Sequence, residues 1–195
     1  MNIYNFPSVY NCGASGGGNS LSYDSFENMH VSTTIDVVDI YSGSNSNWSF
    51  TGSLFNPSLN ININTSSISK ILLQQPVSGG KIAAALCTYD LDNNILTIKA
   101  RSSILTMPPT SVFFEFDFLN SYEIRTTDLN YFIVLTESNG AKCRGILSAS
   151  NQNIRPLPSI FGANLGNLSG GLPTVQTQII PSGEHNQRFY FMIQP

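Results

Sequence analysis

The stretch VFFEFDF at residues 112–118 decides the fold class. Every even-numbered residue in it is apolar, whereas Glu115 and Asp117 occupy odd positions. Successive side chains of a β-strand point to opposite faces, so this order predicts a strand with one buried and one wet face. Residues 58–64, SLNININ, alternate in the same way and predict a second such strand.

Similar patterns and turn residues divide most of the chain into short strands. The Asn139-Gly140 pair favours a type I′ hairpin turn, Asp92–Asn94 and Ser78–Gly80 are comparable turn signals, and Pro108-Pro109 ends a strand. Only residues 19–30 offer a weak helical pattern. The fold class we predict is therefore all-β, an antiparallel β-sandwich with a jelly roll as the favoured variant. Further strands are expected at 31–42, 46–55, 68–74, 81–89, 95–101, 131–137, 142–149, 174–180 and 188–194.

The two ends of the chain differ in character. Residues 1–20 are rich in Asn and contain the run Gly13–Gly18, which predicts a flexible N-terminal arm. Three aromatic residues, Tyr4, Phe6 and Tyr10, make this arm a candidate docking segment. Residues 21–195 contain no linker or repeat and are expected to form a single β-sandwich domain.

Composition excludes several classes of function. Hydrophobic residues make up 41% of the 195 residues, enough for a core, but charged residues only 11%, against roughly 25% in soluble domains. The net charge of −3 and the scattered Lys and Arg residues argue against nucleic acid as a partner. No signal peptide and no apolar run of membrane-spanning length is seen. Cys12, Cys87 and Cys143 are expected to be free thiols.

Motifs that carry chemistry are all incomplete. Gly13–Gly17 matches G-x-S-x-G, but no strand-to-helix context surrounds it. The start of a calcium-binding loop is matched by Asp90, Asp92 and Asn94. The glycine that such a loop needs is replaced by Ile95, and its final glutamate by Arg101. The two histidines, His30 and His185, have no ligand-spaced acidic partner. Glu115 and Asp117 share a strand face and are expected to be solvated acids rather than a glycosidase pair. We expect no catalytic residues, no metal and no cofactor.

Two predicted strands are apolar on both faces, Tyr131–Glu137 and Phe189–Ile193. The outer face of an antiparallel sandwich is normally polar, so something must cover these strands. A covering loop and a subunit interface both satisfy this requirement, and residues 151–173 have the length to supply either. If an interface covers them, its candidate residues are Tyr4, Phe6, Tyr10, Phe132, Val134, Tyr190 and Met192.

The single tryptophan raises a second kind of function. Trp48 is flanked by Asn47 and Ser49, and sugar-binding modules stack an aromatic ring under a pyranose with polar groups at its rim. Tyr41 and Tyr89 are the other candidate glycan-binding residues. Burial of Trp48 at the end of an amphipathic strand explains the same sequence equally well.

Two functions of different classes fit these observations. The first is a non-enzymatic structural subunit that assembles with itself and with other subunits of a viral capsid, vertex (penton) or fibre. Small jelly-roll capsid and penton proteins are similar in composition, although no motif here identifies a family. Such a protein would be made in a host cytoplasm and reside in the virion. The second function is a carbohydrate-binding or adhesin-like β-sandwich module.

Overall fold

The computed structural model describes residues 9–11, 21–24, 36–39, 47–55, 57–137, 141–147, 159–163, 165–166, 171–185 and 187–195. Side chains are described from residue 47 onward, except at 146–147, 184–185 and 187. Within these residues all regular structure is β-strand, and the paired strands run antiparallel. The prediction of an all-β, antiparallel fold is confirmed.

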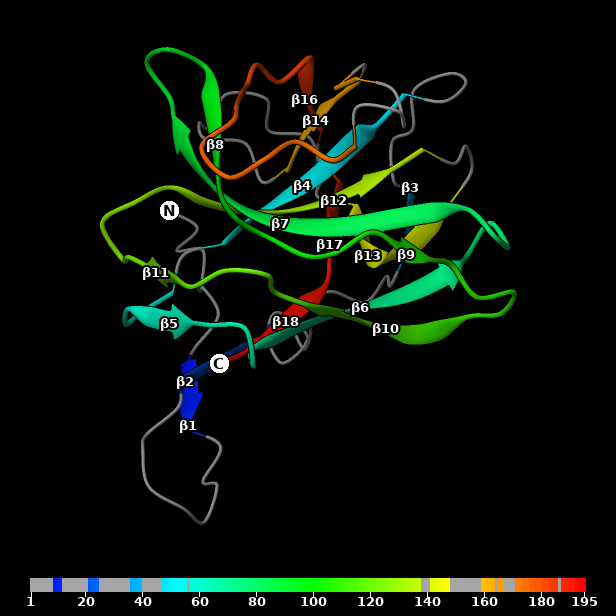
Figure 1. The fold of residues 1–195 in the computed structure, drawn as a ribbon, viewed down its shortest axis with the longest axis horizontal. Helices are drawn as coiled ribbons and strands as arrows, with labels where there is room; N and C mark the ends of the chain where they lie inside the picture. Colours follow the sequence, from blue (N-terminus) through cyan, green and yellow to red (C-terminus); the bar gives the residue numbers. More distant parts are fainter. Residues whose placement is uncertain are drawn as a thin grey trace.

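One of the two large sheets is centred on β6, and we call it the β6 sheet (Figure 1). Its order is β1-β2-β18-β6-β13-β17, with β10 also paired to β6 and β3 to β13. Buried and more accessible residues alternate along β6, as expected for a strand with one face in a core. The strands are β1 (Val9–Asn11), β2 (Leu21–Asp24), β3 (Asp36–Asp39), β6 (Ile68–Gln75), β10 (Val112–Asp117), β13 (Lys142–Leu147), β17 (Gln187–Phe189) and β18 (Phe191–Gln194).

The other large sheet, the β12 sheet, has the order β15-β8-β7-β12-β4-β14-β16, with β9 paired to β7. It curls into a half-barrel. A two-stranded sheet of β5 and β11 lies beside the two large sheets (Figure 1). The strands are β4 (Ser49–Phe55), β5 (Ile61–Ile63), β7 (Lys81–Asp90), β8 (Ile95–Arg101), β9 (Leu105–Thr106), β11 (Tyr122–Ile124), β12 (Asn130–Thr136), β14 (Ser159–Gly162), β15 (Gln178–Ile179) and β16 (Gly183–His185).

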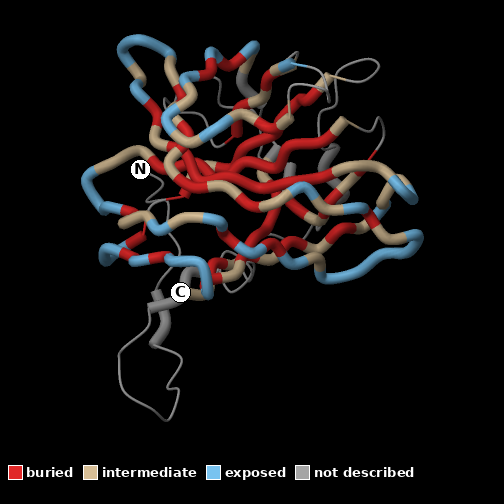
Figure 2. Tube along the Cα trace, viewed as in Figure 1, coloured by how far each residue is buried: buried red, intermediate tan, exposed pale blue. Residues whose placement is uncertain are grey.

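Two hydrophobic cores share the β12 sheet. The inner core lies between the two large sheets, and β12 contributes Phe132 and Val134 to it. The half-barrel core lies on the opposite face of the β12 sheet and receives Tyr131, Ile133 and Leu135 from the same strand. All seven residues of β12 are consequently buried (Figure 2). Burial of a large apolar side chain contributes roughly 1.5–3 kcal/mol, so one strand stabilises both cores.

A buried polar contact ties the two large sheets together. Ser53 of β4 accepts a hydrogen bond from the backbone N–H of Phe189 in β17 at 3.0 Å. The Ser53 hydroxyl in turn donates to the carbonyl oxygen of Phe189 at 3.2 Å. Because the hydroxyl and both backbone groups of Phe189 are satisfied, this buried pair avoids the cost of about 1–3 kcal/mol for an unmade hydrogen bond.

Several local expectations about turns were wrong. Asn139 and Gly140 lie outside the described residues, and the strands on either side of them belong to different sheets: β12 pairs with β4 and β7, and β13 pairs with strands of the β6 sheet. The Ser78–Gly80 turn likewise joins strands of different sheets rather than a hairpin, with Gly79 at a φ of 79°. The Asp92–Asn94 turn does join the paired strands β7 and β8, as predicted.

Strand boundaries also differ from the expectations. Leu59 was placed with Ile61 and Ile63 on a buried face, but β5 begins at Ile61 and Leu59 is 53% exposed. Part of the predicted flexible arm, Val9–Asn11, forms β1 and pairs with β2. β2 in turn lies within residues 19–30, where a short helix was considered. The C-terminal strand is split at Tyr190 into β17 and β18, which have different partners.

Candidate functional site

The candidate glycan-binding rings lie in the interior. Trp48 is fully buried in the half-barrel core, so it has no face to offer a sugar. Tyr89 is only 6% exposed; its ring packs edge-on against Tyr131 at 5.5 Å, and its hydroxyl donates to Asn94 Oδ1 at 2.7 Å. Tyr41 lies outside the described residues. Burial of Trp48, the second explanation of its sequence context, is what the structure shows.

The candidate interface residues of the two-faced strands are also mostly interior. Phe132 and Val134 are fully buried in the inner core, and Tyr190 is 3% exposed. Only Met192, half-buried on β18, keeps an accessible side chain in this group. Tyr4 and Phe6 lie outside the described residues, as does the side chain of Tyr10, whose backbone belongs to β1.

The cover on the outer face of β12 comes from the same chain. The half-barrel core includes three buried residues of this segment: Ile160 in β14, Leu172 in the connection, and Ile179 in β15. Backbone hydrogen bonds hold this cover: Trp48 N–H donates to the Gly166 carbonyl and Leu165 N–H to the Trp48 carbonyl, both at 2.9 Å. Of the two explanations for the apolar faces of β12, a covering segment is therefore the one observed.

The region that resembles a calcium loop is a self-contained hairpin turn. Asp90 Oδ1 accepts hydrogen bonds from the backbone N–H groups of Asp92 and Asn93, each at 3.1 Å, and Asp90 Oδ2 accepts one from the Asn93 side chain at 2.8 Å. These bonds from Asn93 and Asp92 lower the pKa of Asp90, because they favour its ionised form. The carboxylate thus serves the turn itself, with Asn94 in the left-handed region at a φ of 55°.

Exposed apolar side chains are frequent in and near β10 along the chain. Of the six large apolar residues exposed in the described part of the chain, four fall between residues 104 and 119. We call these four residues the β10 patch. Its most accessible member is Phe113, 60% exposed, and the full set is Ile104, Val112, Phe113 and Leu119.

The geometry of β10 explains why the patch is exposed. β6 is its only strand partner among the described strands, so β10 lies at an edge of the β6 sheet. Phe116 faces the inner core, and Phe113 points to the same side as Glu115 and Asp117. Glu115 forms an ion pair of 2.7 Å with Lys70, directly opposite on β6. The exposed ring of Phe113 therefore lies at a sheet edge, on the same side of the strand as Glu115, whose charge is paired with Lys70.

Sequence reasoning missed this patch although a signal was present. Phe113 breaks the alternation of residues 112–118, because it is the one apolar residue on the polar side of the strand. Leu119 and Ile104 carried no comparable signal. The backbone around Leu119 pairs with the end of β8, since Leu119 N–H donates to the Arg101 carbonyl at 2.9 Å and Ser102 forms a bridge with Phe118.

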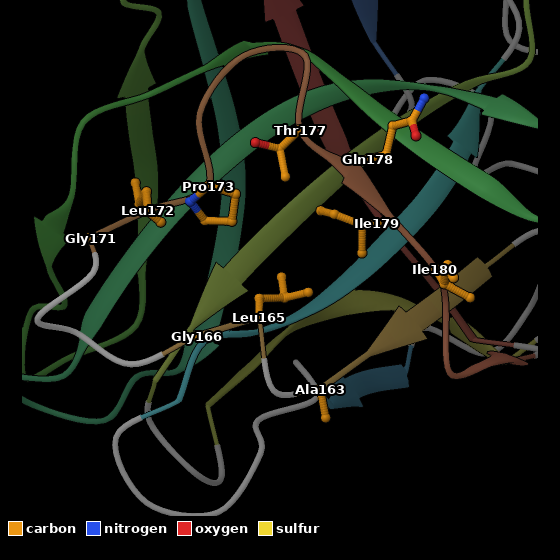
Figure 3. Close-up of a pocket in the computed structure, with 10 residues that line it drawn as sticks. All are labelled: Ala163, Leu165, Gly166, Gly171, Leu172, Pro173, Thr177, Gln178, Ile179 and Ile180. Atoms are coloured by element: carbon orange, nitrogen blue, oxygen red, sulfur yellow. The ribbon is translucent and has the colours of Figure 1, made fainter.

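A pocket of about 570 Å³ opens where the half-barrel is covered (Figure 3). Ala163 follows β14 and Gln178 belongs to β15, strands near opposite ends of the sheet order, so curling of the sheet brings them together. Figure 3 shows Leu165 and Ile179 reaching toward the centre of this space from two sides. The described lining residues are Ala163, Leu165, Gly166, Gly171, Leu172, Pro173, Thr177, Gln178, Ile179 and Ile180.

Comparisons with known proteins return no relative. No protein-family model, no curated protein and no solved structure matches this chain. In the described residues no helix is long and apolar enough to cross a membrane.

Proposed function

We propose that this chain is a non-enzymatic structural subunit that assembles with itself and with other subunits of a viral shell. The assembly we have in mind is a capsid, vertex or fibre built from jelly-roll-type sandwiches, with the protein made in a host cytoplasm and incorporated in the virion. The observation that carries the proposal is Phe113 of the β10 patch, a ring that is 60% exposed on an edge strand of the β6 sheet.

Energetic considerations support an assembly role for the patch. Full burial of a Phe side chain contributes roughly 1.5–3 kcal/mol, and Phe113 forgoes more than half of this gain in the isolated chain. Edge strands with apolar side chains invite pairing with other chains, and free monomers usually protect them with charge. Only 11% of the residues in this chain are charged, which leaves little repulsion to oppose contact.

The residues that support assembly differ from those that the sequence suggested. All side chains of β12 are buried within the chain itself, whereas the Phe113 ring of β10 is exposed. The carbohydrate-binding alternative relied on Trp48 and Tyr89, and both rings are buried. Among the exposed large apolar residues of the described part of the chain the one aromatic side chain is Phe113, which was not a candidate of that alternative.

Sedimentation equilibrium of the full-length protein over a range of concentrations tests the proposal. We expect reversible or stable oligomers, and Phe113→Lys should weaken self-association by about tenfold or more, equivalent to about 1.4 kcal/mol. Ile180→Lys is the matched control, because Ile180 is 72% exposed but lies outside the patch. A wild-type chain that stays monomeric at high micromolar concentration contradicts self-assembly, and equal effects of the two variants contradict the role of the patch.

A further inference from the structure

The covering segment of the half-barrel forms a pocket that the assembly role does not use. Its volume of about 570 Å³ lies inside the roughly 300–1,000 Å³ that is common for small-molecule sites. Six of its ten described lining residues are Ala, Leu, Pro or Ile. Thr177 and Gln178 are the polar side chains of the lining, and no described lining residue is ionisable. Figure 3 shows the Gln178 amide directed away from Leu165 and Ile179, so Thr177 is the polar side chain available to a ligand.

Both walls of the pocket are fastened to the β12 sheet by backbone hydrogen bonds. On one side Leu165 and Gly166 bond to the backbone of Trp48, each at 2.9 Å. On the other side the Ile98 N–H donates to the Thr177 carbonyl at 3.0 Å, and the Gln176 N–H donates to the Ile98 carbonyl at 2.8 Å. A pocket held in this way is formed before any ligand arrives, which lowers the entropic cost of binding.

Unusual backbone conformations gather at the same place. Five described residues have positive φ, and two of them line the pocket, Gly166 at 114° and Gly171 at 71°. A third, Gln176 at 69°, directly precedes the lining residue Thr177. Gln176 pays a steric cost that a glycine would avoid. Lys99 Nζ lies 3.5 Å from Gln176 Oε1 as a hydrogen-bond donor, so β8 holds both the side chain and the backbone of Gln176 in place. Residues with strained backbones, held in place by their surroundings, are often found at ligand sites.

We propose that this pocket binds a small uncharged amphiphile, with an apolar body against Leu165, Leu172 and Ile179 and a hydroxyl or carbonyl group toward Thr177. Burial of an apolar body is favourable in proportion to the apolar area removed from water. A charged head group finds no counter-charge among the described lining residues, and its desolvation without a partner is strongly unfavourable. The class of ligand therefore follows from the lining: neutral, mostly apolar and able to make one or two hydrogen bonds.

A matched series of ten-carbon probes tests the ligand class. Isothermal titration of the full chain with 1-decanol, decanoate and decylamine separates neutral, anionic and cationic heads on one apolar tail. Decanol is kept below its solubility limit, and the two charged probes below their micelle concentrations. Decanol should bind saturably at one site per chain, and each charged probe at least about tenfold more weakly, a difference of about 1.4 kcal/mol. No saturable decanol binding, or a charged probe that binds as tightly as decanol, overturns the proposal.

Two surface variants locate the binding. Ile180→Asp places a carboxylate on the pocket lining and should weaken decanol binding by about tenfold. Leu59→Asp is the control, since Leu59 is also exposed but does not line the pocket. Both positions are more than half exposed, so both variants should fold, and circular dichroism checks that they do. Equal binding by the two variants overturns the assignment to this pocket. Phe113→Lys should bind decanol like the wild type, which keeps this test independent of the assembly role.

Discussion

Replacement of Trp48 tests the interior of the molecule most directly. The side chain is fully buried in the half-barrel core, and its indole Nε1 has no hydrogen-bond partner. Trp48→Ala removes the largest buried side chain and leaves a cavity, for which large-to-small core substitutions cost about 3–5 kcal/mol. In a chain of 195 residues each kcal/mol lowers Tm by about 2–4 °C, so we expect a decrease of about 10 °C.

Trp48→Phe sharpens this test. Phenylalanine keeps an aromatic ring in the core and removes the unpaired N–H, whose burial costs about 1–3 kcal/mol. We therefore expect Trp48→Phe to lose less than half of the stability that Trp48→Ala loses. Thermal melts followed by circular dichroism give the comparison, since both variants lack the sole tryptophan fluorophore. Leu59→Ala, at an exposed position, should stay within about 0.5 kcal/mol of the wild type. If Trp48→Ala keeps the wild-type Tm, the packing argument is refuted.

The remaining predictions concern thiols, a glycine and a tyrosine. Cys87 and Cys143 are buried, and burial raises the pKa of the Cys87 thiol. Both should therefore react with a thiol reagent only after denaturation, and rapid reaction in the native protein would contradict this. Gly52→Ala should destabilise by about 1–3 kcal/mol, because its Cβ would lie 2.8 Å from Ile133 Cγ2; a denaturant midpoint equal to the wild type argues against that close approach. Burial, followed by the charge of Asp128, raises the pKa of Tyr122 to about 12, above its ordinary value of 10.0. The folded state then holds this proton more tightly than the unfolded state, so stability should be lost as pH rises from 10.0 towards about 12, and Tyr122→Phe should reduce that loss in denaturant titrations.

Alternation along single strands was enough to predict the fold class and many strand positions. β8 (Ile95–Arg101) was expected at its observed residues, because its apolar and polar residues alternate cleanly. β14 was missed, since its four residues lie in a stretch without periodicity and their burial depends on the rest of the β12 sheet. Pairing between distant strands was harder to foresee. The Asn139-Gly140 signal is local, and the contacts of β12 with β4 and β7 outweigh it.

The candidate sites show the same limit. Trp48 and Tyr89 have amphipathic side chains, and their exposure depends on whether the segment after residue 159 covers them. The residues next to them in sequence gave no information about that segment. The apolar faces of β12 were recognised, and a covering segment was one of the two explanations offered. Phe113 was visible in the sequence as a departure from alternation, whereas the pocket is created by the curl of a sheet and left no pattern to find.

The two-sided burial of β12 has a consequence for how the chain finds its strand alignment. A one-residue shift of an ordinary half-buried strand turns its apolar side chains to water, and this penalty enforces the correct alignment. A shifted β12 would exchange Phe132 and Val134 for Tyr131, Ile133 and Leu135, and every apolar side chain would still be buried. Hydrophobicity alone therefore does not choose between the two alignments. The choice falls to side-chain shape, above all to Gly52 on β4, where Ile133 occupies the space that a side chain would need.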